Sequence, residues 1–280
     1  MNKKEKYFIE LNKIIRDFLD INDERLLVGY FINNSNLPGR RANLELANAF
    51  ADNSAEFKES SSKKLWDLCL FLISFTPDKA PSNDPKEFLS FCGTWAIGAI
   101  GASNPKYYHE SLNILKKQSE DNRWRVREAV ALGLQKLLMK HPDKTLTKIR
   151  EWIEDTNWLT MRAVVAGVAH LSVLVNNNIS KNALQIHELI FSKIISCTNF
   201  SSEEFKILKK GLSYTLSVIV LANPDEGFKF LSDYINTENK YIQMILRDNL
   251  KKNRLTKNFP RAVTSISQIL NEQLRKGNIR

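Results

Sequence analysis

The sequence is poor in residues that interrupt or cross-link a chain. It holds 10 glycines, 8 prolines and 3 cysteines among 280 residues, which argues against collagen-like, low-complexity and disulfide-stabilised proteins. Cys69, Cys92 and Cys197 lie far apart and form no CxxC motif, so no zinc knuckle is expected and a reducing cytoplasm is the predicted location. A hydrophobic share of 43% supports a folded core.

Long apolar segments are also missing. The first 20 residues are densely charged and contain no secretory signal. The best apolar stretch, residues 211–222, is shorter than the roughly 20 residues that cross a bilayer. We therefore predict a soluble protein without a membrane partner.

Familiar cofactor and metal motifs are absent as well. The sequence has no GxxxxGK[ST] phosphate loop and no HExxH, and its four histidines have no cysteine or second histidine at metal-ligand spacing. No strand precedes the glycine run of residues 93–101, so we interpret it as a place where helices approach closely. His170 is interpreted as a tolerated core residue. No cofactor and no metal are predicted.

Positive charge is concentrated at the C-terminal end. Residues 240–280 hold ten basic and two acidic residues, a net charge of +8 out of the chain's +10, which leaves +2 for the remaining 239 residues. Such a segment on a near-neutral body predicts a polyanionic partner, nucleic acid above all. A solvated helix surface is the simpler alternative.

Apolar residues recur at helical spacing almost everywhere, as in residues 129–138 and 163–174. Short breaks at residues 104–105, 141–142 and 223–224 each end in proline and predict inter-helix turns. The proline-rich segment 76–85 either joins an N-terminal helical subdomain, residues 1–76, to the rest or is a surface loop in one array over residues 1–280. The predicted fold class is all-α.

Two segments repeat a short pattern. Asp121 to Arg127 and Asp155 to Arg162 each precede an apolar helix, with Trp124 and Trp158 separated by 34 residues, and a weaker copy lies at residues 238–241. A period of about 35–45 residues with two helices per unit indicates an α-solenoid, a superhelix of stacked helix pairs. The units resemble HEAT repeats, which commonly place Asp in the turn and Arg in the second helix.

The stretch from Trp124 to Arg162, and Tyr214 followed by residues 223–225, resemble the AlkD-like alkylpurine DNA glycosylases, which are built of HEAT-like repeats. The resemblance implies a concave face on which two tryptophans, an aspartate and an arginine contact damaged DNA. Trp124 matches the first tryptophan, Tyr214 the second and Arg162 the arginine. The aspartate position falls on Glu128, or on Arg127 if the helix alignment has a gap of one residue.

Excision of a cationic alkylated base builds positive charge on the sugar, and a carboxylate such as Glu128 stabilises that charge. Aromatic faces such as Trp124 and Tyr214 add cation–π attraction. No cofactor is needed. If Arg127 points into the groove instead, catalysis is lost, whereas duplex DNA is still bound through its phosphates. The residues predicted to contact DNA are Arg123, Arg127, Arg162, Arg247, Lys251 and Arg254.

Helical spacing supports the C-terminal DNA contacts, because Arg247, Lys251 and Arg254 fall at i, i+4 and i+7 and so lie on one helix face. Structural alternatives stay open for the other candidates: Trp124 and Tyr214 as packing residues, Glu128 as a first-turn acid that complements the helix dipole, and ladders that pair Arg127 with Asp121 and Arg162 with Asp155.

Three functions follow. The first is a DNA-binding repeat protein that grips duplex backbone with a basic concave face and excises alkylated purines if Glu128 is in place. The second is a non-catalytic protein–protein scaffold, for which the concave face would be apolar or acidic. The third is an RNA-binding solenoid, although no one-base-per-repeat code of polar residues is present.

Overall fold

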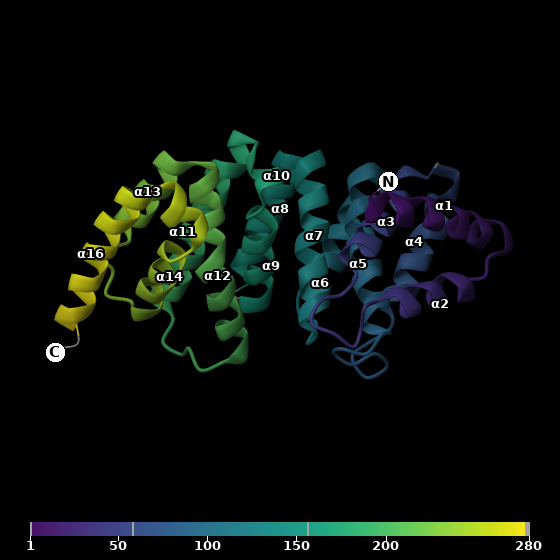
Figure 1. Ribbon diagram of the computed structural model, residues 1–280, viewed down its shortest axis with the longest axis horizontal. Helices are drawn as coiled ribbons and strands as arrows, with labels where there is room; N and C mark the ends of the chain where they lie inside the picture. The colour runs from purple at the N-terminus through teal and green to yellow at the C-terminus, as the bar shows by residue number, and fades with distance from the viewer. Residues whose placement is uncertain (1, 58, 156, 278–280) are drawn as a thin grey trace. The chain divides into compact units, whose positions relative to one another are not determined.

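The computed structural model describes residues 2–57, 59–155 and 157–277. Over these ranges the chain forms sixteen α-helices and one short 3₁₀ helix and contains no strand (Figure 1). The predicted all-α fold class is confirmed. The chain divides into two compact units, residues 1–141 and 142–280, and the division falls on one of the predicted inter-helix turns.

The first unit contains seven α-helices and the 3₁₀ helix within the described residues. They are α1 (Lys3–Ile21), α2 (Arg25–Asn34), α3 (Leu44–Glu56), α4 (Glu59–Ile73), α5 (Glu87–Ser103), η1 (Pro105–Tyr107), α6 (Tyr108–Gln118) and α7 (Trp124–Lys140). The proline-rich segment 76–85 lies between α4 and α5, which pack against each other.

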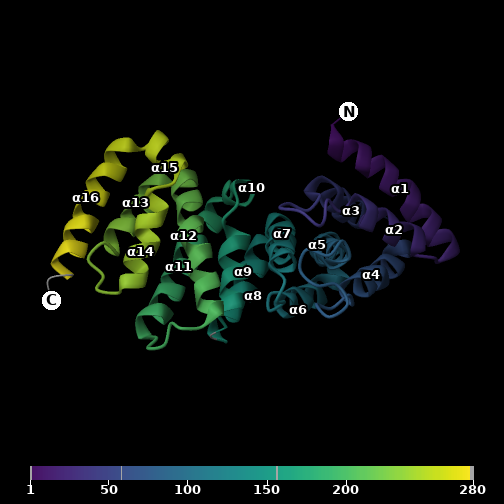
Figure 2. The ribbon, with the colours of Figure 1, turned by 60° about the horizontal axis from the view of Figure 1, so that its bottom comes forward.

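Alternate helices of the first unit are neighbours in space. α1 packs on α3, α3 on α5 and α5 on α7, while α2, α4 and α6 pack beside this row (Figure 2). This order, in which helix i contacts helix i+2, is that of an α-solenoid.

α5 is the centre of the first unit, and its residues from Glu87 to Ala102 are buried. The predicted close approach at the glycine run is confirmed, because a Cβ atom placed on Gly98 would lie 2.3 Å from Cα of Gly133 in α7. Side chains are therefore excluded where the two helices cross.

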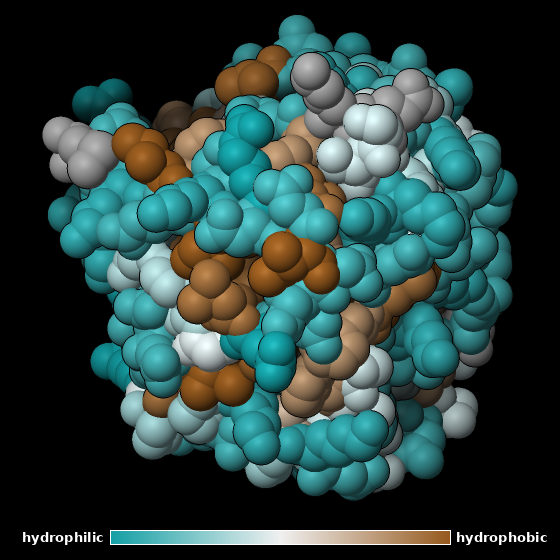
Figure 3. Space-filling view, turned by 90° about the vertical axis from the view of Figure 1, so that its right-hand side faces the viewer, coloured by the Kyte–Doolittle hydropathy of each residue, from teal (hydrophilic) through white to brown (hydrophobic). Residues whose placement is uncertain are grey.

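The helices α1 and α2 lie at one end of the first unit (Figure 2). Figure 3 shows small groups of hydrophobic residues separated by hydrophilic ones on this side of the molecule. Ile9, Ile21 and Leu26 are the exposed large apolar residues of the two helices. Scattered residues of this kind are normal on protein surfaces.

The second unit, taken by itself, has the same kind of architecture. Its helices are α8 (Pro142–Glu154), α9 (Trp158–Val168), α10 (Leu171–Leu174), α11 (Asn177–Ser196), α12 (Glu203–Ala222), α13 (Pro224–Asp233), α14 (Lys240–Leu250), α15 (Asn253–Asn258) and α16 (Pro260–Gly277). α9, α12 and α14 pack in this order as one layer, and α8, α11 and α13 as the other (Figure 1). The solenoid arrangement predicted from the repeats is thus present within each unit.

Local sequence explains where these helices begin. Pro142 and Pro224 stand at the first position of α8 and α13, as predicted, because proline fits the first helical turn. The repeated tryptophans are also the first residues of helices, Trp124 of α7 and Trp158 of α9. The side chain of Asn157 caps α9 by accepting hydrogen bonds from backbone N–H groups of its first turn.

Residues 163–174, whose apolar spacing is helical, do not form one continuous helix, and the predicted core position of His170 is wrong. α9 ends at Val168, and His170 is exposed and caps the four-residue helix α10. Its ring nitrogen Nδ1 lies 2.7 Å from the hydroxyl of Ser172 and accepts a hydrogen bond from the Ser172 N–H. This local capping competes with continued helix.

Candidate functional site

An exposed tyrosine marks one face of the second unit. Tyr214 lies in the apolar helix α12, yet 46% of its surface is exposed. The guanidinium of Arg254, from α15, covers one side of its ring, with Cζ 4.4 Å from the ring centroid. Such contacts stabilise by about 0.5–1 kcal/mol at exposed sites and hold the cation in place. Tyr214 is therefore available at the surface instead of being a core residue.

A third helix contributes Arg162 to this neighbourhood. The side chain of Arg162, from α9, packs on α12 at Gly211, where an added Cβ would lie 3.3 Å from the Arg162 Cγ atom. Gly211 is three residues before Tyr214, and the exposed Lys210 is four residues before it, so all three share one side of α12. We call Arg162, Lys210, Tyr214 and Arg254 the Tyr214 face.

The buried Asn249 of α14 fixes the position from which Arg254 reaches this face. Its side-chain oxygen accepts a hydrogen bond from the Ser217 N–H at 2.8 Å, and its side-chain nitrogen donates to the Leu212 carbonyl oxygen at 2.8 Å. Both partners belong to α12. This clamp joins the end of α14 to α12, and α15 begins four residues later.

The prediction that Arg247, Lys251 and Arg254 share one helix face is wrong. α14 ends at Leu250, Lys251 caps it, and Arg254 belongs to the separate helix α15. Nε of Arg247 is buried and has no hydrogen-bond partner among the described residues. The structure thus brings Arg254, but not the whole row, to Tyr214.

Within the described residues, two cations of the Tyr214 face, Lys210 and Arg254, are not neutralised by an ion pair. Over the part of the chain that the structure describes, no carboxylate forms an ion pair with Lys210, Lys251 or Arg254. The nearby carboxylate of Asp248 instead accepts a hydrogen bond from the Ser213 hydroxyl at 3.0 Å. This face is consequently positively charged and open to an anion.

In the first unit, two of the predicted DNA contacts are buried. Arg123 is 2% exposed and pairs with Asp121 at 2.7 Å, and it donates hydrogen bonds to the carbonyl oxygens of Phe75 and Ala80. Arg127 donates to the backbone carbonyl oxygen of Asp121. This geometry disfavours phosphate contact for both side chains and, for Arg127, favours the structural alternative of a bond to Asp121.

Sequence reasoning missed Arg125, which lies between them and is also buried. It forms an ion pair with the buried Glu87 at 3.0 Å and donates a hydrogen bond to the Gly39 carbonyl oxygen. Its guanidinium lies 4.5 Å from the ring centroid of Trp124. Only a contact 38 residues away in sequence reveals this role.

Trp124 itself is 49% exposed, so about half of its surface is open while Arg125 packs on its ring. Glu128, four residues further along α7, is half-buried. These two residues belong to the first unit, and Arg162 and Tyr214 belong to the second. The combined glycosylase site stays a prediction.

Metal-binding clusters and membrane-spanning helices are both absent from the described residues. No group of three or more His, Cys, Asp or Glu residues in these ranges is arranged to hold a metal ion. Among the helices of these ranges, none combines the length and apolar character that crossing a membrane requires.

Comparison with known proteins adds no family. No protein-family model matches the chain, and a search of curated proteins yields no match. Among solved structures, one designed armadillo repeat protein is 16% identical, with 88% of this chain and 99% of that chain covered and a TM-score of 0.32. A second designed armadillo repeat protein, in complex with the peptide (KR)4, is 16% identical, with 88% and 98% covered and a TM-score of 0.27. At these TM-scores the likeness carries no argument about the site.

Proposed function

We propose that the protein is a non-catalytic interaction protein whose second unit holds an anionic partner on the Tyr214 face. One observation carries the proposal: the Arg254 guanidinium from α15 lies 4.4 Å from the centroid of the exposed Tyr214 ring, and the exposed Lys210 stands one turn before Tyr214 on the same side of α12. Cations gathered beside an aromatic ring bind carboxylates or phosphates.

The partner we infer first is an acidic segment of another protein. A grip on duplex DNA was predicted to use six cations, and the burial of Arg123 and Arg127 disfavours two of these contacts. A short acidic segment can pair its carboxylates with the cations of the Tyr214 face alone. Fold class alone does not decide between the two partners, so the experiment compares them directly.

The test measures fluorescence anisotropy of the full chain with a labelled oligoglutamate peptide and with labelled duplex DNA over a range of salt concentrations. We expect the peptide to bind at low salt, with an affinity that falls as salt rises. Arg254→Ala is expected to weaken binding about threefold, as is usual for one exposed charge pair. Lys144→Ala, which removes an exposed cation of α8, is the matched control and should change nothing.

Each outcome has a consequence. Tight DNA binding with a salt slope that Arg254→Ala lowers by about one would replace the acidic protein with duplex DNA as the partner. Equal loss in Arg254→Ala and Lys144→Ala would mean that general charge, not the Tyr214 face, binds the ligand. Absence of binding to both ligands at low salt would overturn the proposal.

The finer prediction, excision of alkylated purines by an AlkD-like site, is supported by the exposure of Trp124 at the start of α7. It is tested by incubating the protein with alkylated duplex DNA and measuring released methylpurine. Release that Glu128→Gln abolishes while DNA binding persists would establish the reaction. No release above the Glu128→Gln background leaves the interaction function alone.

A further inference from the structure

A groove separates two helices in the other layer of the second unit. It lies between α11 and α13 and has a volume of about 510 Å³, within the range of about 300–1,000 Å³ that is common for ligand sites. On α11 it extends from Lys181 to Glu188, which at 1.5 Å per residue corresponds to about 10 Å. An extended peptide of about three residues has this length.

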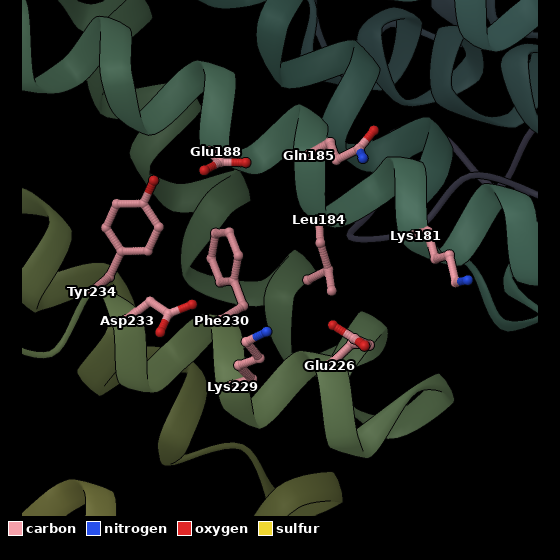
Figure 4. A pocket seen from close by; sticks show the side chains of 9 residues that line it. All are labelled: Lys181, Leu184, Gln185, Glu188, Glu226, Lys229, Phe230, Asp233 and Tyr234. Carbon is pink, nitrogen blue, oxygen red and sulfur yellow. The ribbon is translucent and has the colours of Figure 1, made fainter.

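The floor of the groove is apolar and one end is acidic. Leu184 and Phe230 lie between the two helices, and Figure 4 shows Glu188, Asp233 and Tyr234 together at the end opposite Lys181. Burial, followed by the carboxylates of Glu188 and Asp233, raises the pKa of the Tyr234 hydroxyl. The two carboxylates therefore act on the same hydroxyl, although they come from different helices.

The acidic end has no cationic partner of its own. Within the described residues, neither the carboxylate of Glu188 nor that of Asp233 forms an ion pair or a side-chain hydrogen bond, and the same holds for the nearby ammonium group of Lys229. Unpaired carboxylates that flank an apolar floor are complementary to a cationic side chain with an apolar stem.

The neighbouring helices α8 and α11, by contrast, are linked to each other by polar side chains. Between α8 and α11, Lys193 pairs with Glu154 at 3.5 Å, and Arg150 donates a hydrogen bond to the Gln185 side chain. Asn178 further donates to the Asp143 carboxylate at 2.6 Å. Such cross-links bridge the α8–α11 boundary, whereas the charged residues of the α11–α13 groove remain unlinked.

Aromatic rings at the acidic end favour arginine over lysine. The half-buried Tyr234 lines the groove and packs against Phe230, with ring centroids 5.0 Å apart. A guanidinium can stack on an aromatic face and donate to carboxylates at its edge.

We propose that the α11–α13 groove binds a short arginine-containing peptide segment of a partner protein, with apolar residues on Leu184 and Phe230 and the guanidinium between Glu188 and Asp233. This site is distinct from the Tyr214 face, takes a ligand of the opposite charge, and does not depend on the proposed function.

The test is an NMR titration of the ¹⁵N-labelled full chain with N-acetyl-leucyl-leucyl-arginine amide. A second titration uses the same peptide with glutamate in place of arginine, called the glutamate-ended peptide, as the charge-reversed ligand. Shift changes are expected in α11 and α13 only. Glu188→Gln combined with Asp233→Asn should weaken binding about fivefold or more, because two charge pairs are lost. Glu272→Gln, an exposed acid of α16, is the matched control.

The variants replace exposed carboxylates by amides of the same size, so the fold is expected to persist, and unchanged shifts in the other helices confirm it. Arg254→Ala should leave this binding unaltered, which separates a failure here from a failure of the Tyr214 face. Equal binding of the glutamate-ended peptide, shifts outside α11 and α13, or full affinity in the double variant would each overturn the proposal.

Discussion

The contact between Gly98 and Gly133 offers the sharpest test of the packing in the first unit. A Cβ atom on Gly98 would lie 2.3 Å from Cα of Gly133 and 2.7 Å from its carbonyl carbon and oxygen. Non-bonded carbon atoms sit at about 3.5–4.0 Å. Because the obstacle is backbone, no side-chain rotation relieves the clash in Gly98→Ala, and α5 and α7 must move apart by more than about 1 Å.

The cost follows from the burial of α5. Overpacking of a dense core costs about 1–3 kcal/mol, while replacement of a helical glycine by alanine returns about 1 kcal/mol. Since α5 is buried between α3 and α7, a shift at Gly98 disturbs both neighbours. We expect Gly98→Ala to lower the free energy of unfolding of the first unit by about 2 kcal/mol.

Gly29 of α2 is the matched control. Nothing lies within 4 Å of a Cβ placed there, so Gly29→Ala should stabilise the first unit by about 0.5–1 kcal/mol through helix propensity alone. The assay is urea unfolding of the full chain followed by circular dichroism, with hydrogen exchange of α5 amides to assign the transition. If Gly98→Ala is as stable as the original protein, the close packing of α5 on α7 is refuted.

Two further predictions concern buried polar groups of the second unit. Burial lowers the pKa of His187 to about 4, so between that value and about 6.5 the unfolded chain binds a proton that the folded chain does not. The free energy of unfolding should therefore fall by roughly 3 kcal/mol as the pH falls through this window. The variant His187→Gln should remove most of this pH dependence when it is measured by thermal unfolding. Asn249→Ala leaves the Leu212 carbonyl oxygen and the Ser217 N–H without their buried partner; we expect a loss of about 2–3 kcal/mol in chemical unfolding and weaker anion binding, and unchanged stability would mean that the clamp is not formed.

Much of the fold follows from local sequence. The helical periodicity, the prolines at the starts of α8 and α13, and the repeated aromatic residues that open α7 and α9 all depend on neighbours within a few residues. The sequence alone left a core position for Tyr214 open, and the structure shows that its ring is exposed and contacts Arg254; the predicted roles of both residues in binding stay predictions.

The predicted DNA contacts at the start of α7 are disfavoured, because the arginines there are bound by groups that are distant in the sequence. Arg123 is held by carbonyl oxygens of Phe75 and Ala80, more than 40 residues away. Arg125 is likewise held by distant groups, the Glu87 carboxylate 38 residues away and the Gly39 carbonyl oxygen 86 residues away. Helical spacing states which residues share a face, but not whether a loop from elsewhere in the chain covers that face.

The row of Arg247, Lys251 and Arg254 failed for a different reason. Its spacing assumes an uninterrupted helix, and α14 ends before Lys251. No proline or glycine marks this end in the sequence. The tertiary clamp through Asn249 holds the end of α14 instead, so the break is set by packing against α12.

The two proposed surfaces of the second unit carry opposite charge on its two layers, and this sets how their ligands should influence each other. Helix layers pack about 8–10 Å apart, so ligands on the outer sides of both layers are separated by more than the Debye length of about 8 Å at physiological salt. Saturating oligoglutamate on the Tyr214 face should therefore change the dissociation constant of the arginine peptide by less than about twofold. At low salt the negative charge of bound oligoglutamate attracts the positively charged arginine peptide over a longer range. The arginine peptide should then bind more tightly when oligoglutamate is present. Coupling of about tenfold that persists at physiological salt would contradict this electrostatic argument and require a conformational change that links α12 to the groove.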